Sequence, residues 1–264
     1  MNSGTTALSF DGTEIWFTDT GGPGPVTVLL HGLTMTSRSN FEVCYTTGVD
    51  GKIAPGERPS VSLLLRDAGG RVIGIDARGH GRSGRSDDPD RYRGDSHALD
   101  VVAVLDTIGA SDAHVVGYSM GSTTALRLAL IDSRIRSLAL AGTGPNCVEG
   151  VSPEWRAEFE AVGNCFVTNS WNEHPDLKFF RACARLDETH DFASLGAAAF
   201  GLEPIAADSP ARIAVPVLVL NGGADNGDDD AARLAAMIPG RRQPWSAPAI
   251  TARRVAIASF RTSC

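Results

Sequence analysis

Residues Ala113–Gly121, with the sequence Ala-His-Val-Val-Gly-Tyr-Ser-Met-Gly, decide the fold of this chain. The apolar start of this stretch predicts a short buried strand, and the run Ser122–Ile131 that follows predicts a helix. A serine in the sharp turn between a strand and a helix presents its hydroxyl to a cleft, and flanking glycines leave room for the turn. A chance G-x-S-x-G in a glycine-rich chain is the alternative, but the strand–turn–helix context disfavours it. We therefore predict that Ser119 is a nucleophile.

Apolar strands alternate with helices on both sides of this stretch. The other predicted strands are Val26–Leu30, Arg71–Ile75, Ile135–Ala141 and Val215–Leu220, with an N-terminal hairpin around Asp11-Gly12 and a helix over Asp95–Ile108. Continuous apolar runs are typical of parallel strands that are buried on both faces. The alternation predicts an α/β fold with a mostly parallel central sheet flanked by helices.

Two segments interrupt the alternation. Ser37–Pro59 is long and polar, and we expect a loop there, before a helix that ends near Asp67. Residues 150–210 are rich in Trp, Phe, Arg and Asp and contain no strong strand pattern. We expect this segment to be a helical cap over the carboxyl edge of the sheet, where such folds bind ligands. The predicted organisation is a core from 1–149 and 211–264, with the cap insertion between them.

Bulk composition excludes several classes of function. The chain has 264 residues, a net charge of −7 and no basic stretch that would follow a phosphate backbone, so we expect no nucleic-acid partner. Met1–Thr6 has no apolar segment of a signal peptide, and no apolar run approaches the ~18 residues of a membrane helix. Five irregularly spaced cysteines suit a reducing compartment. We expect a cytoplasmic protein without a membrane partner, and the sequence does not indicate an oligomeric state.

Three more motifs follow predicted strands in order. His31-Gly32 follows the first long apolar strand, Asp76–Ser83 reads Asp-Ala-Arg-Gly-His-Gly-Arg-Ser, and Gly222–Asp225 reads Gly-Gly-Ala-Asp after Val217–Leu220. With Gly117–Gly121, these motifs resemble the α/β-hydrolase fold family, in its serine-esterase-like branch. The resemblance runs from about Gly12 to Gly240. Each motif alone is weak, but four in the right order form a strong signal.

The resemblance implies a role for particular residues. Ser119 is the nucleophile, and the backbone N–H groups of Met120 and Leu33 form the oxyanion hole. Asp225 is the acid that orients the base, because it directly follows the strand as the triad acid does. Its rivals are Asp228–Asp230, which we expect to open the next helix, since carboxylates suit a helix N-terminus.

His31, Gly32 and Tyr118 are expected to border the substrate. His31 also invites a catalytic interpretation, as does His80, but the resemblance implies that both are structural or oxyanion-loop residues. Asp76 and Arg78, in the Asp76–Ser83 motif, are likewise expected to brace a loop.

The catalytic base is missing from this pattern. In the family the order along the chain is Ser, then acid, then His. The six histidines are His31, His80, His97, His114, His174 and His190. None follows Asp225. Removing the base of a serine triad lowers kcat by about 2 × 10⁶, roughly 8–9 kcal/mol.

A frameshift near Arg241 is our hypothesis for this absence. The tail after Gly240 contains Pro244 and Pro248 where the last strand should be, and proline is excluded from a central strand. In a shifted frame, codons 248–252 can spell Gly-Asp-His-Gly, between a strand and a capped helix. The His codon could also give Tyr or Asn, although a GC-rich gene favours His. Coding DNA without a His codon in that frame would refute the hypothesis.

Two functions fit these residues. The first is hydrolysis of a small carboxylic ester or related acyl substrate through an acyl-enzyme on Ser119; amide, lactone, thioester and carbon–carbon cleavage and perhydrolysis stay open. The alternative is a catalytically impaired or non-catalytic ligand-binding homologue, because the triad His is absent. An active-site serine probe separates them, since fast labelling requires a base. We expect no cofactor and no metal.

Six aromatic residues of the predicted cap are candidates for an acyl pocket, although packing of the cap is the expectation for most of them. They are Trp155, Phe159, Phe166, Trp171, Phe179 and Phe180. Loss of the final strand and helix would also expose apolar surface at the sheet edge, so we predict low stability and aggregation.

Overall fold

The computed structural model describes residues 4–43, 45–47, 53–56, 59–152, 154–221 and 227–239. The predicted acid Asp225 and the tail after Pro239, with its proposed frameshift, lie outside the described residues. In the part of the chain that is described, no helix is long and apolar enough to cross a membrane.

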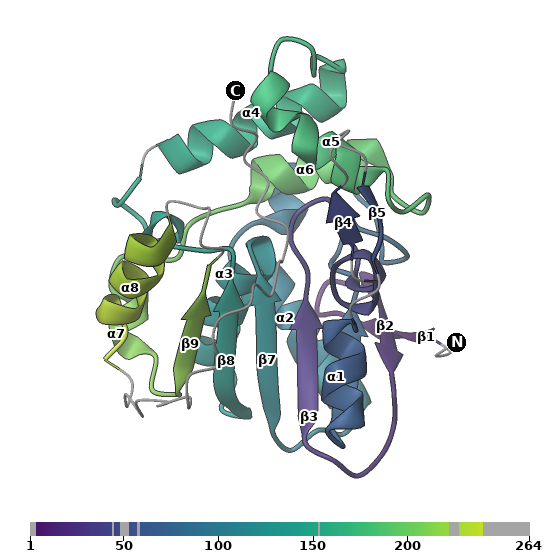
Figure 1. The fold of residues 1–264 in the computed structure, drawn as a ribbon, viewed down its shortest axis with the longest axis vertical. Coiled ribbons are helices and arrows are strands. Elements are labelled where there is room, and N and C mark those ends of the chain that lie inside the picture. The colour runs from purple at the N-terminus through teal and green to yellow at the C-terminus, as the bar shows by residue number, and fades with distance from the viewer. Residues whose placement is uncertain are drawn as a thin grey trace.

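The centre of the molecule is a seven-stranded sheet in the order β1-β2-β6-β3-β7-β8-β9 (Figure 1). The strands are β1 (Gly4–Leu8), β2 (Glu14–Asp19), β3 (Val26–Leu30), β6 (Arg71–Ile75), β7 (Ala113–Tyr118), β8 (Ile135–Ala141) and β9 (Val217–Leu220). β1 and β2 pair antiparallel, as do β2 and β6, and all pairs from β6 to β9 are parallel. The predicted hairpin and the mostly parallel sheet are confirmed.

Alternation along the strands divides the core between two faces of the sheet. Val28 and Leu30 of β3 join a large buried cluster that includes α2 (Ser96–Thr107) and α3 (Met120–Ile131). Leu29, between them, packs with Val72 in a smaller cluster beside α1 (Val61–Asp67). All five residues of β3 are buried, as a strand covered on both faces requires.

Helices lie above the carboxyl ends of the parallel strands, where Figure 1 shows α4, α5 and α6 over the arrow tips. Their bounds are Glu154–Thr168, Lys178–Ala184 and Phe192–Gly201. They share a buried cluster with Met120 and Leu33 of the core. The domain boundaries at 150 and 210 stay a prediction, but the segment between them is helical as expected.

The remaining elements are short or lie beside β9. They are α7 (Ser209–Arg212), α8 (Gly227–Met237) and 3-10 turns at Pro89–Tyr92, Pro145–Cys147 and Pro175–Leu177. α8 begins just before the three aspartates that were predicted to open it, so that prediction is confirmed.

The prediction of a loop over Ser37–Pro59 is wrong in part. A π-helical turn spans Arg38–Glu42, and a two-stranded hairpin pairs β4 (Tyr45–Thr47) with β5 (Ile53–Pro55). Phe41 of the π-helical turn is buried in the same cluster as Leu29, which fixes the segment on the sheet. A single buried aromatic residue gives no periodic pattern for sequence analysis to detect.

Candidate active site

The turn between β7 and α3 holds Ser119 in a strained backbone conformation. Its φ and ψ are 51° and −113°, a region that L-residues rarely adopt. The Ser119 N–H donates to Ala141 O at 2.8 Å, and Ser119 O accepts from Ser122 N at 2.8 Å. These bonds tie the turn to the end of β8 and to the first turn of α3. Strain of this kind persists only where the surroundings hold it, and it clusters at active sites.

The two glycines of the motif are required by close backbone contacts. A Cβ on Gly117 would lie 2.6 Å from the carbonyl carbon of Gly121, and a Cβ on Gly121 would overlap the carbonyl of Leu30. α3 therefore packs directly against β7 and the end of β3. No larger residue fits at either position without moving the turn.

Ser119 lines a cleft of about 180 Å³ between the sheet and the cap helices. The core contributes Ser119, Met120, Thr123, Gly142, Thr143, Asn146 and Cys147 to its lining. The cap segment contributes Trp155, Glu158, Phe159, Phe180 and Leu202. A pocket at the carboxyl ends of the strands is where open α/β sheets bind ligands.

The predicted oxyanion donors lie on two neighbouring segments. Met120 is the first residue of α3, so its N–H has no partner within the helix. A Cβ on Gly32 would lie 3.4 Å from Cβ of Ser119, which places the loop that carries Leu33 against the nucleophile turn. Among the described residues, none accepts a hydrogen bond from Leu33 N or Met120 N. Both N–H groups therefore remain proposed oxyanion donors.

Two buried histidines support the loop that carries Leu33. The N–H of Ala77 donates to Nε2 of His31 at 2.9 Å, so Nδ1 carries the proton that His31 donates to Gly32 O at 2.8 Å. Likewise Thr34 N donates to Nε2 of His80 at 3.2 Å. Burial lowers the pKa of His31 to about 4 and that of His80 well below its ordinary value, so both rings are neutral.

The loop is also held by two aspartates. Asp76 Oδ1 accepts from Ser37 N at 2.9 Å, which confirms its bracing role, and burial raises the pKa of Asp76 to about 6. Asp187, from the cap segment, accepts from Thr36 Oγ1 at 3.1 Å. The position of Leu33 therefore depends on contacts from both the core and the cap.

Arg78 confirms its predicted bracing role through a buried ion pair. Its Nη2 lies 2.6 Å from Asp100 Oδ1 and its Nη1 lies 2.9 Å from Asp11 Oδ2. Because both Arg78 and Asp100 are almost fully buried, each charge depends on the other.

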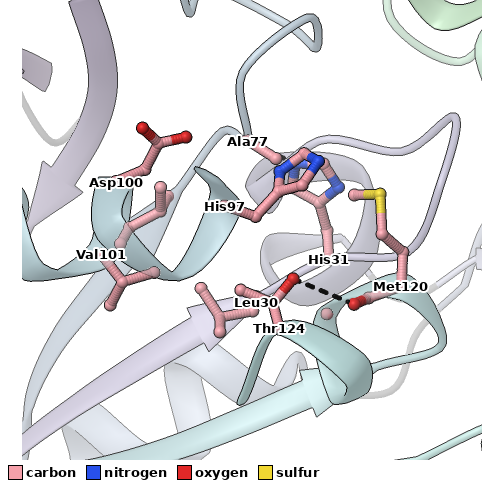
Figure 2. Close-up of a pocket in the computed structure, with 10 residues that line it drawn as sticks. Leu30, His31, Ala77, His97, Asp100, Val101, Met120 and Thr124 are labelled. Atoms are coloured by element: carbon pink, nitrogen blue, oxygen red, sulfur yellow. Dashed lines mark hydrogen bonds between the residues drawn. The ribbon is translucent and has the colours of Figure 1, made fainter. Parts of the chain in front are cut away.

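No histidine lines the cleft, although the structure describes all six. His31 and His97 instead line a separate internal cavity of about 20 Å³ beneath the nucleophile turn (Figure 2). His114 bonds to Ser137 Oγ at 2.8 Å, and His190 contacts Ala184 O and Met35 O at 2.9 and 3.2 Å. The described structure therefore brings no imidazole to Ser119, in agreement with the absence of a late histidine in the sequence.

The other predicted site residues are placed as follows. Tyr118 and Gly32 do not line the cleft; a Cβ on Gly32 would lie 2.9 Å from the Tyr118 ring, so the two pack together. Their predicted contact with substrate stays untested. Asp230, a rival acid, pairs with Arg233 at 3.1 Å.

Sequence reasoning missed most of the polar cleft. Thr123, Thr143 and Asn146 supply hydroxyl and amide groups, and Glu158 supplies a carboxylate. Thr123 could have been found, because it lies four residues after Ser119, one helical turn along α3. Thr143 lies in a loop, Asn146 in the 3-10 turn Pro145–Cys147 and Glu158 on α4 of the cap, and no motif identifies any of the three. The described residues form no cluster of His, Cys, Asp and Glu suited to a metal ion.

Comparison with known proteins gives one family. The chain matches the family described as the alpha/beta hydrolase fold over residues 25–197, which is more than half of its length. A 2-hydroxy-6-oxononadienedioate/2-hydroxy-6-oxononatrienedioate hydrolase from Burkholderia vietnamiensis is 36% identical over 139 residues, 51% of this chain and 42% of that protein. An sn-1-specific diacylglycerol lipase from Xenopus tropicalis is 35% identical over 117 residues, 44% of this chain and 30% of that protein.

Similarity to solved structures covers more of the chain. An esterase from Exiguobacterium antarcticum superposes with a TM-score of 0.67 at 22% identity, covering 90% of this chain and 89% of that one. The sequence matches, by contrast, span 17–42% of the length of the curated relatives. The family match agrees with the strand order and with the strained turn at Ser119, and the chain belongs to the α/β-hydrolase fold family.

Proposed function

We propose that this protein is a serine hydrolase that acts on a small carboxylic ester or related acyl compound. The observation that carries the proposal is the conformation of Ser119, which places a serine side chain in a cleft at the N-terminus of a helix. A strand-to-helix turn of this kind is where a serine hydroxyl is exposed for attack on a carbonyl carbon.

The chemistry follows from the groups around Ser119. Its Oγ bonds to the carbonyl carbon, the carbonyl oxygen becomes an oxyanion, and the Met120 and Leu33 N–H groups donate to it. One such donor contributes about 10²–10³ to the rate. The Ser119 hydroxyl proton passes to solvent water, and collapse breaks the bond to the alkoxide, which takes a proton from solvent and leaves as the alcohol. Water then attacks the acyl-enzyme and releases the acid and free Ser119. Thr36 and Asp187 matter indirectly, because they hold the loop that carries Leu33.

The Ser119 proton has no histidine to accept it. The chain as written therefore retains only the contributions of the oxyanion hole and of binding, which amount to about 10³–10⁴ over water in a triad enzyme. We propose Asp225 as the acid of the lineage. Activity of this chain should be far below that of a protein that retains the triad.

Labelling by a fluorophosphonate probe tests the proposal. We expect slow, stoichiometric modification that Ser119→Ala abolishes and the matched control Ser111→Ala, at an exposed serine, leaves unchanged. Intact-protein mass spectrometry gives the rate and peptide mapping gives the site. Modification of another serine, or none at Ser119 in the folded protein, would contradict the proposal.

A second candidate function is ligand binding without turnover. The absence of any histidine from the cleft favours it. It predicts that acyl compounds bind to the cleft while Ser119 fails to react over hours, so the same labelling time course separates the two candidates.

A further inference from the structure

Three aromatic rings form the cap-side wall of the cleft that contains Ser119. Trp155 and Phe159 lie on α4, and Phe180 lies on α5. The ring centroids of Trp155 and Phe159 are 4.7 Å apart at an interplanar angle of 64°, and those of Phe159 and Phe180 are 6.3 Å apart at 70°. Both pairs are close to edge-to-face, so the wall is a continuous series of steeply tilted rings.

Three other aromatic residues of the cap do not line the cleft, although two of them, Phe166 and Trp171, belong to the same buried cluster as Trp155 and Phe159. Phe166 packs against Trp171 at 4.8 Å and against Phe192 at 5.4 Å, and none of the three lines the cleft. Trp155, Phe159 and Phe180 therefore do two things: they pack within the cap, and they present ring surface to the cleft that Ser119 also lines.

The size of the cleft matches one aromatic ring. Its volume is about 180 Å³. For comparison, an engineered apolar cavity of about 150 Å³ in another protein binds benzene. A phenyl group fits such a space, whereas a long acyl chain would have to extend out of it.

The chemistry of the wall favours an aromatic occupant over a saturated one. An aromatic ring has a negative face and a positive edge, so a third ring placed edge-to-face gains attraction beyond the area it buries. Thr123 and Asn146 contribute polar groups to the same cleft and can receive the polar end of the substrate.

We infer that the preferred substrates carry a single aromatic ring next to the reacting carbonyl, as in aryl-substituted short-chain esters. This inference rests on the proposed function, because it takes the cleft beside Ser119 as the substrate site. Phe159 and Phe180 then determine specificity by contacting the ring of the substrate.

Binding to the Ser119→Ala variant tests the inference without requiring turnover. Calorimetric titration compares methyl phenylacetate with methyl cyclohexylacetate, which share the ester group and a six-membered carbon ring but differ in whether that ring is planar and aromatic. We expect the phenyl ester to bind about tenfold more tightly, which corresponds to about 1.4 kcal/mol. Adding Phe159→Leu should reduce the ratio to about threefold or less, whereas the matched control Phe192→Leu, at a ring that does not line the cleft, should leave it unchanged. Phe180→Leu is the second variant if Phe159→Leu does not fold.

Equal affinity for the two esters, or no binding of either, would overturn the inference. An unchanged ratio in both Phe159→Leu and Phe180→Leu would do the same. If Ser119 reacts with the serine probe but the ratio is near one, the proposed function stands and the aryl preference is wrong. If Ser119 does not react but the phenyl ester binds preferentially, the hydrolase proposal fails and the cleft is an aryl-binding pocket.

Discussion

Acidification from pH 7.5 to 5.0 should destabilise this protein because buried histidines must remain neutral in the folded state. Burial lowers the pKa of His31 to about 4 and that of His97 to about 3, from an ordinary value of 6.5. His80 shifts in the same direction. In the unfolded chain these rings bind protons below pH 6.5. Protonation therefore stabilises the unfolded state, whereas the folded state keeps the rings neutral and gains no such stabilisation. The contribution of these histidines to the free energy of unfolding is fully present above pH 6.5. It is lost as the pH falls from 6.5 towards the pKa values of the folded state.

The magnitude follows from the interval between the unfolded pKa and the final pH. At pH 5.0 this interval is about 1.5 pH units for His31 and for His97, worth about 2 kcal/mol each at ~1.36 kcal/mol per unit. Asp76 opposes them, since its pKa is raised to about 6 and the folded state gains about 1 kcal/mol by binding a proton. The net loss is about 3 kcal/mol, with a further loss from His80, out of the ~5–15 kcal/mol typical of a domain.

Urea unfolding at the two pH values measures this loss, with His97→Leu as the variant. His97 lies 7% exposed in the internal cavity, and no described residue bonds to either of its nitrogens, so leucine removes a buried polar group without breaking a hydrogen bond (Figure 2). We expect His97→Leu to recover about 2 kcal/mol of the loss between pH 7.5 and 5.0. The control Val101→Ala, at a buried residue that lines the same cavity and carries no titratable group, should leave the loss unchanged. An identical pH dependence in the wild type and in His97→Leu would refute the reasoning.

Three further perturbations follow from the packing. Arg78→Met leaves Asp100 buried without its partner and should lower the free energy of unfolding by about 3–5 kcal/mol, whereas Arg66→Met, in an exposed pair, should cost under ~1 kcal/mol in the same urea titration. Gly121→Ala places a methyl group against the carbonyl of β3 and should cost about 1–3 kcal/mol, measured as a lower Tm together with slower probe labelling. Leu218 is 52% exposed on the terminal strand β9, so Leu218→Lys should reduce self-association, measured by analytical ultracentrifugation, without lowering the Tm. Unchanged self-association would contradict a contact through this edge of the sheet.

The core of the fold was predictable because its signals are local. A strand buried on both faces must be continuously apolar, and Val26–Leu30 and Ile135–Ala141 became β3 and β8 with the same bounds. Proline marks the start of β9, since Pro216 cannot donate to the ladder and the strand begins at Val217 rather than at the predicted Val215. α3 begins at Met120, two residues before its prediction, because the helix starts immediately after the strained serine.

That no histidine follows Asp225 was also visible in the sequence, because a residue that is not encoded cannot be supplied by folding. The sequence also identified Ser119, because the close backbone contacts at Gly117 and Gly121 admit only glycine. The two glycines therefore mark the serine between them in the sequence. Which residues face Ser119 across the cleft was decided by tertiary structure alone. Packing placed Phe159 and Phe180 in the cleft and Phe166 outside it. These side chains come from helices that are far from Ser119 in the sequence. Aromatic residues that pack a cap have the same local sequence pattern as aromatic residues that line a pocket, so only the three-dimensional structure distinguishes the two kinds.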